Sequence, residues 1–240
     1  MARHSKWHKV RQFKGAIDAK RAASFTKLSH EITVAVKEKG PDVATNVRLK
    51  VAIERAKKAS MTKDTIERAI QRGTGGSGEG QLESPIYEAY APGGTALIIE
   101  CVTDNKNRST NDVKHLVTKA GGTLASSGSV TYLFDRCGVV RIVPSIPVER
   151  RDDVELAFIE AGASDIVHDD EGTDVRSAPS DLAQVADAVQ KTGFTVESAE
   201  FEWIPKVTVE TDEATGMIVS ELIDHLDGLD DVSRVYSNLA

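Results

Sequence analysis

Apolar residues in the first third of the chain recur at intervals of three and four residues, a spacing that places them on one side of an α-helix. Phe25, Leu28, Ile32 and Ala35 show this spacing. The pattern predicts three amphipathic helices, over residues 18–39, 47–59 and 63–72. Short helices with one apolar side pack together. We therefore expect a small helical bundle near the amino end.

A glycine-rich stretch, GTGGSGEG at residues 73–80, follows these helices. It lacks the Gly-Lys-Ser/Thr sequence of a phosphate-binding loop, and no apolar strand precedes it. We interpret it as a flexible linker. Beyond it, two apolar runs on either side of Pro92-Gly93-Gly94 predict a β-hairpin.

A unit of amphipathic helix, glycine and strand then recurs four times, as DVKHLVTKAGGTLAS, VELAFIEAGASDIVH, LAQVADAVQKTGFTVES and MIVSELIDHLDGLDDVSRVY. Gly121, Gly162, Gly193 and Gly228 stand where a helix commonly ends on a left-handed residue. Four such units supply the helices of two ferredoxin-like βαββαβ domains.

The expected fold class is therefore α+β with three domains: an N-terminal helical bundle followed by two ferredoxin-like α/β domains, one inserted in the other. GVVRIV would begin the inserted domain and FTVESAEF would close it. The expected boundaries are 1–75 for a basic arm and the bundle, 81–134 plus 205–240 for the outer α/β domain, and 135–204 for the inserted domain. A tandem arrangement is the alternative.

Charge is distributed unevenly along the chain. Residues 1–75 hold 18 Lys and Arg against 7 Asp and Glu, whereas residues 76–240 hold 12 against 30. The first segment therefore carries +11 and the remainder −18, in a protein of net charge −7. Such asymmetry indicates a module that binds a polyanion, attached to an acidic body. A solvated helical surface that happens to be basic is the simpler alternative.

The opening sequence, MARHSKWHKVRQFK, has the residue types that bind RNA. Its cations neutralise phosphates, and Trp7 offers a face on which an unstacked base can stack. We predict nucleic-acid contacts in the arm and the first helix at Arg3, Lys6, Trp7, Lys9, Arg11, Lys14, Lys20, Arg21 and Lys27.

A second candidate contact lies in CVTDNKNRSTNDV, residues 101–113. A helix is expected to begin near Thr110, and the free N–H groups at its start, beside Lys106 and Arg108, would suit a phosphate. Ordinary capping by Asn107, Ser109 or Thr110 is the alternative.

Other chemistry has little support in the sequence. His4 and His8 are spaced for metal binding on a helix but have no further ligand nearby, so we expect no metal and no cofactor. No nucleophile motif or dinucleotide fingerprint is present, and we expect no enzyme. No apolar run is long enough to span a membrane, and we expect a cytoplasmic protein. Cys101 and Cys137 lie in apolar runs and are expected to be buried free thiols.

Two further functions stay open. The second and third helices could form a helix-turn-helix that presents Lys63, Arg68, Gln71 and Arg72 to duplex DNA, although the turn lacks the usual glycine. A protein–protein scaffold is the weaker alternative. The oligomeric state is left open.

Several short motifs in order resemble the YebC family: HSKW (4–7), DAKR (18–21), FTKL (25–28), IERAI (66–70), PGG (92–94), TDNKNR (103–108), SGSVTYLF (127–134) and IPKVTVE (204–210). Relatives include the mitochondrial translational activator of cytochrome c oxidase. The resemblance implies a helical domain and two α/β domains. It implies either a DNA-binding transcriptional regulator or a ribosome-associated factor that helps translation through proline-rich stretches, with ribosomal RNA or tRNA as partner. Arg3, Val47 and Ala91 stand where the family usually has Gly, Pro and Gly.

Overall fold

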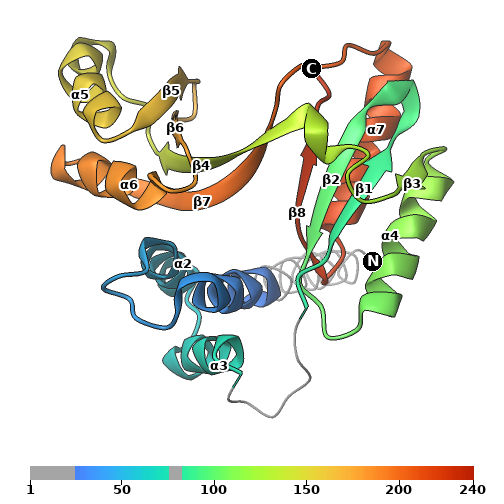
Figure 1. The fold of residues 1–240 in the computed structure, drawn as a ribbon, viewed down its shortest axis with the longest axis horizontal. Coiled ribbons are helices and arrows are strands. Elements are labelled where there is room, and N and C mark those ends of the chain that lie inside the picture. Colours follow the sequence, from blue (N-terminus) through green and yellow to red (C-terminus); the bar gives the residue numbers. More distant parts are fainter. Residues whose placement is uncertain (1–24, 76–82) are drawn as a thin grey trace, which may run out of the picture.

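The computed structural model describes residues 25–75 and 83–240 (Figure 1). Its first part is the predicted helical bundle, formed by a helix described over residues 25–39, α2 (Val47–Lys58) and α3 (Lys63–Gly73). Their apolar sides meet in one core that includes Leu28, Ile32 and Leu49.

Gly73 belongs to α3 and not to the linker that the sequence suggested. A Cβ atom at this position would lie 2.6 Å from Cβ of Val36 and 2.9 Å from the Thr33 carbonyl oxygen. Because Gly73 has no side chain, α3 can pack closely against the first helix.

The outer α/β domain combines two segments that are far apart in the sequence. Its strands and main helices are β1 (Ile86–Tyr90), β2 (Ala96–Cys101), α4 (Lys106–Lys119), β3 (Thr123–Ala125), α7 (Glu213–Asp227) and β8 (Val232–Ser237). Short 3₁₀ turns occupy Pro92–Gly94 and Thr131–Leu133. The strands are antiparallel in the order β3-β1-β2-β8. Helices α4 and α7 pack on one face of this sheet, over Leu97 and Ile99.

The second sheet is built wholly from the intervening segment. Its elements are β4 (Phe134–Ile142), α5 (Val148–Glu160), β5 (Ala163–His168), β6 (Thr173–Ser177), α6 (Leu182–Lys191) and β7 (Val196–Pro205). The antiparallel order β5-β6-β4-β7 is that of a ferredoxin-like βαββαβ domain.

The outer sheet has the same spatial order with a permuted sequence. In the order of the ferredoxin-like motif, β2 is the first strand, β3 the second, β1 the third and β8 the fourth. In the chain, however, β1 comes before β2, so the sequence order is permuted. The predicted fold class, α+β with a bundle and two ferredoxin-like domains, one within the other, is confirmed. The residue boundaries given above remain our proposed division of the chain.

The long strands β4 and β7 connect the two α/β domains (Figure 1). They pair from Phe134↔Pro205 to Ile142↔Val196. Phe134, at the beginning of β4, packs against Ile98 of the outer sheet. At the other end, Val51 of α2 joins the core of the inserted domain, so the bundle also rests on this domain.

Besides the assignment of Gly73, three local predictions were wrong. Helix α4 begins at Lys106, not near Thr110, because Asn105 caps it. Gly121, Gly162 and Gly193 have positive φ, as predicted. Gly228 has φ of −73°, because α7 ends in a continued right-handed turn in which the Leu229 N–H donates to the Leu226 carbonyl. Of the two free cysteines, Cys101 is buried as predicted but Cys137 is partly exposed.

Candidate nucleic-acid interface

Most of the predicted contacts lie outside the described residues. These are Arg3, Lys6, Trp7, Lys9, Arg11, Lys14, Lys20 and Arg21. His4 and His8 lie outside them too. Lys27, Lys106 and Arg108 are described, and the structure places each of them differently.

Lys27 lies on the first helix and reaches the outer domain. Its Nζ atom is 2.7 Å from a carboxylate oxygen of Asp227, at the end of α7, and it also donates to the Asp227 main-chain carbonyl. The Lys27 side chain is 23% exposed. Lys27 therefore joins the bundle to α7, and a phosphate would compete with Asp227 for it.

Helix α4 is capped by a residue that the sequence reasoning did not choose. The Asn105 side chain accepts a hydrogen bond from the Arg108 N–H at 3.1 Å. Ser109 and Thr110, which were candidate caps, instead bond within the fold. Lys106, the first residue of the helix, is exposed.

Arg108 is held by carboxylates. Its guanidinium donates to Asp231 at 2.9 Å and to Asp104 at 2.9 Å. Asp231 also accepts from the buried hydroxyls of Ser109 at 2.6 Å and Thr103 at 3.0 Å. Burial raises the pKa of Asp231, but the hydrogen bonds from Ser109, Arg108 and Thr103 outweigh it and leave the pKa below its usual value. Hydrogen bonds to Asp231 raise the pKa of Arg108.

Asp231 thus occupies the place beside Arg108 where the sequence predicted a phosphate. The structure brings Arg108 and Lys106 onto one helix but directs Arg108 to Asp231. The sequence contained a weak signal for this, since Asp230-Asp231 immediately precedes β8 and β8 pairs with β2. That pairing is visible only once the strand order is known.

The second and third helices have the order of a helix-turn-helix. Ser60, in the turn between α2 and α3, has φ of +67° and takes the backbone conformation for which a glycine is usual. Helix α3 exposes Lys63, Arg68 and Gln71. Glu67 lies among them, with its carboxylate 3.6 Å from Nζ of Lys63.

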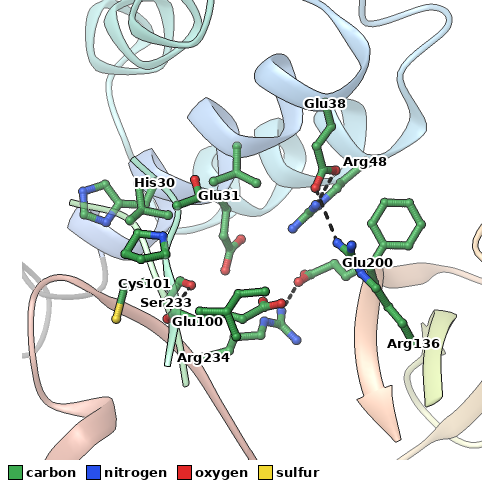
Figure 2. A pocket seen from close by; sticks show the side chains of 16 residues that line it. His30, Glu31, Glu38, Arg48, Glu100, Cys101, Arg136, Glu200, Ser233 and Arg234 are labelled. Atoms are coloured by element: carbon green, nitrogen blue, oxygen red, sulfur yellow. Dashed lines mark hydrogen bonds and ion pairs between the residues drawn. The ribbon is translucent and has the colours of Figure 1, made fainter. Parts of the chain in front are cut away.

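A cavity of about 250 Å³ lies where the three domains meet (Figure 2). Residues from every domain line it, including Glu31 and Arg48 of the bundle, Arg136 and Glu200 of the inserted domain, and Arg234 of the outer domain. Figure 2 shows Glu200 meeting Arg234 on one side, and Glu38 between Arg48 and Arg136 on the other.

Alternating charges connect the domains across this cavity. Arg55 of α2 lies 2.7 Å from Glu200 of β7 and 3.1 Å from Glu31 of the first helix. Arg234 of β8 forms ion pairs with Glu200 and with Glu202, the latter at 3.1 Å. Burial, and next the neighbouring charge of Glu200, raise the pKa of Glu31.

Aromatic side chains complete the junction. The guanidinium of Arg136 lies 5.3 Å from the ring centre of Phe201, and that of Arg48 lies 5.6 Å from the same ring. Trp203 donates from its indole N–H to Glu100 of β2 at 2.9 Å. Arg48 thus joins the bundle to the inserted domain, and Trp203 joins the inserted domain to the outer one.

The cavity is better explained as a junction between domains than as a ligand site. Drug-sized ligands occupy pockets of about 300–1,000 Å³ that are mostly apolar. Here the space is smaller, and its carboxylates already face arginines. Glu38 and Glu200 pair with arginines of neighbouring domains, and Glu31 pairs with Arg55 of the bundle itself. Sequence reasoning missed these residues, because they are far apart in the chain and ordinary in composition.

The part of the chain that the structure describes holds neither a cluster of metal ligands nor a membrane-spanning helix. Within residues 25–75 and 83–240, no three His, Cys, Asp or Glu side chains come together as metal ligands. None of the helices in these two ranges has the length and apolar character needed to cross a bilayer.

Comparison with protein families identifies the chain. The model of the TACO1/YebC protein N-terminal domain matches residues 5–76, and that of the TACO1/YebC second and third domain matches residues 82–239. The chain belongs to the TACO1/YebC family. The two family models meet at residues 76–82, which follow the bundle and lie outside the described residues, as does most of the stretch that we interpreted as a linker.

Relatives in the TACO1/YebC family are similar over their whole length. A "probable transcriptional regulatory protein" from Persephonella marina is 48% identical, with 99% of this chain and 95% of the relative covered. One with the same name from Serratia proteamaculans is 46% identical, covering 99% and 96%. The crystal structure of a conserved hypothetical protein from Aquifex aeolicus superposes with a TM-score of 0.84 at 41% identity, covering 93% and 92%.

Proposed function

We propose that this protein is a non-enzymatic, nucleic-acid-binding regulator of gene expression. Its target is RNA on the ribosome, either ribosomal RNA or tRNA, and it assists elongation through proline-rich stretches, as the family resemblance implies. The N-terminal arm makes the main contacts, and the acidic α/β body positions the arm and limits binding to other nucleic acids.

The separation of charge is the observation that carries this proposal. Eighteen cations fall in residues 1–75, and the rest of the chain has a net charge of −18. Each phosphate neutralised by Lys or Arg releases counterions, which gives affinity without base contacts. An acidic body repels a second polyanion, so binding is directed to the basic segment.

The ion pairs in the described residues support a division of roles among the basic residues. Lys27 and Arg55 connect the bundle to the acidic domains, and Arg108 is held by Asp231. Cations of the arm are thereby left as the main candidates for RNA contact. Lys106 remains a secondary candidate, and Arg108 contributes by holding the start of α4 in place.

Ribosome sedimentation tests the proposal. We expect the arm variant Lys6→Glu, Lys9→Glu, Arg11→Glu to lose sedimentation with ribosomes at moderate salt. The matched control, Arg150→Glu, Lys191→Glu, Lys206→Glu, makes the same change of charge at exposed positions of the α/β body and should sediment like the wild type. Undiminished sedimentation of the arm variant would refute the proposal.

Duplex DNA is the second candidate target. Two observations favour it: the relatives are named as transcriptional regulators, and Ser60 supports the turn between α2 and α3. A competition between duplex DNA and structured ribosomal RNA at one salt concentration distinguishes the two targets. If DNA is the target, Arg68→Ala with Gln71→Ala lowers duplex binding; if RNA is the target, this variant keeps the affinity for RNA.

A further inference from the structure

Helix α4 has an exposed face without acidic residues, although it belongs to the acidic part of the chain. Val113 and Val117 point into the core of the outer domain. On the exposed side, two adjacent rows of residues spaced four apart follow the helix axis. One row is Lys106, Thr110, Lys114 and Thr118, and the other is Asn107, Asn111, His115 and Lys119.

Within residues 25–75 and 83–240, no carboxylate pairs with the lysines of this face. Asp112, the one acid of α4, lies in the next row of the helix with Arg108. Lys106, Lys114 and Lys119 are exposed, and none of them forms an ion pair with any residue in ranges 25–75 and 83–240. The nearby carboxylates of Asp104 and Asp231 are taken by Arg108, which lies in the next row of the helix. The face therefore presents free ammonium groups together with amide and hydroxyl donors.

Helix α4 also lies near the first residues of the described chain. Lys27, close to the first described residue, contacts Asp227 at the end of α7. Helix α7 packs beside α4 over the same sheet, and Leu222 of α7 shares a core with Val113 of α4 (Figure 1). A nucleic acid held by the arm would therefore have α4 among its nearest surfaces.

We propose that the exposed face of α4 is a second contact surface for the phosphate backbone of the RNA bound by the arm. This inference rests on the proposed function. Lys106 and Lys114 are separated by two helical turns, or about 12 Å along the axis, so they meet different phosphates. Asn107, Asn111 and Thr118 donate to phosphate or ribose oxygens. Contacts of this kind position the RNA and carry no sequence preference.

The salt dependence of RNA binding tests the α4 face. The affinity of the full chain for a fluorescently labelled RNA hairpin is measured by anisotropy at several KCl concentrations. In the variant Lys106→Gln, Lys114→Gln, Lys119→Gln, we expect the slope of log K against log salt to fall by about 2, since each lost phosphate contact removes roughly 0.7–0.9. We also expect affinity at low salt to fall by about 10-fold or more.

The matched control is Arg150→Gln, Lys191→Gln, Lys206→Gln, which removes three charges outside α4. It should keep the wild-type slope, and circular dichroism should show both variants folded. An α4 variant with the wild-type slope, or one that changes no more than the control, would overturn this inference. The arm variant separates the two proposals: if that variant binds RNA normally, the proposed function itself fails.

Discussion

Arg55 of α2 and Glu200 of β7 form an ion pair between the helical bundle and the inserted domain, with 2.7 Å between Nη1 and Oε1. The Glu200 side chain is 7% exposed and also pairs with Arg234 of the outer domain. One carboxylate thus holds arginines from two other domains. Together with the Lys27–Asp227 pair and the packing of Val51, this contact joins the basic bundle to the acidic body.

Replacing Glu200 by Gln should destabilise the protein by about 3 kcal/mol, because two arginines then lose their shared counter-charge in a largely buried site. Urea unfolding measures the loss. The control is Glu197→Gln, a replacement on the same strand as Glu200. It breaks the exposed ion pair between Glu197 and Lys58 of α2, at 3.3 Å, and should lower the free energy of unfolding by less than about 1 kcal/mol. Equal costs for the two variants would contradict the role given to Glu200.

Asp231→Ala should lower the free energy of unfolding by about 2 kcal/mol, because the buried hydroxyls of Thr103 and Ser109 lose their acceptor. The control is Asp230→Ala at the neighbouring exposed residue, which should change the free energy of unfolding by no more than about 0.5 kcal/mol. Chemical denaturation compares the two. A harmless Asp231→Ala would show that this cluster does not fix the start of α4.

Asp169 in the β5–β6 turn should titrate well below an ordinary aspartate. The hydrogen bond from Arg141, and next that from the Gly172 N–H, lower the pKa of Asp169 to about 2. The folded value is below the unfolded one, so this group stabilises the fold above about pH 4 and the contribution is lost as the pH falls toward 2. NMR of the side-chain carboxyl carbon measures the midpoint.

The variant Arg141→Gln tests the cause of that shift. We expect the midpoint of Asp169 to rise toward the ordinary value but to stay below it, since the Glu171 and Gly172 N–H groups still donate. Arg176→Gln removes a different ion pair on the same sheet, with Asp165, and should leave Asp169 unchanged. A midpoint that is the same in all three proteins would disprove the assignment to Arg141.

The two cysteines should differ in their reaction with thiol reagents. Burial raises the pKa of Cys101 to about 12, and its side chain lies in the core of the outer domain. Burial also raises the pKa of Cys137, but this side chain is partly exposed and a reagent can reach it. Native protein at pH 8 should therefore be labelled at Cys137 alone, and Cys101 should react only after unfolding. Mass spectrometry of labelled peptides identifies the site, and Cys137→Ser should abolish native labelling.

The sequence predicted the secondary structure and the nested domains well because these depend on local periodicity. The apolar spacing in residues 25–39, the glycines after α4, α5 and α6, and the apolar runs of β2 and β4 each act within a few residues. The permuted order of the outer sheet needed long-range pairing, since β8 lies beside β2 although their first residues, Ala96 and Val232, are 136 positions apart in the chain.

The candidate site was predicted less completely for the same reason. The sequence shows that Arg108 is positively charged but not that Asp231 holds it, because their contact depends on the pairing of β2 with β8. Likewise, the junction of Arg55 and Glu200 joins residues from separate domains. The basic face of α4 was predicted in part, since the sequence placed Lys114 and Lys119 on a helix. Only the true start of α4 shows that Lys106 belongs to the same helix.

The position of β8 has a consequence for biosynthesis. The inserted domain has all its strands once the chain has been made to Pro205, whereas the outer sheet is incomplete until residues 232–237 have been made. Until then, the edge of β2 has no partner, and unpaired edges promote aggregation. A premature stop just before β8 would thus yield a chain with a complete inserted domain and an outer sheet that lacks one edge strand. We expect such a chain to aggregate or to be bound by chaperones and degraded, and not to function as a shortened protein.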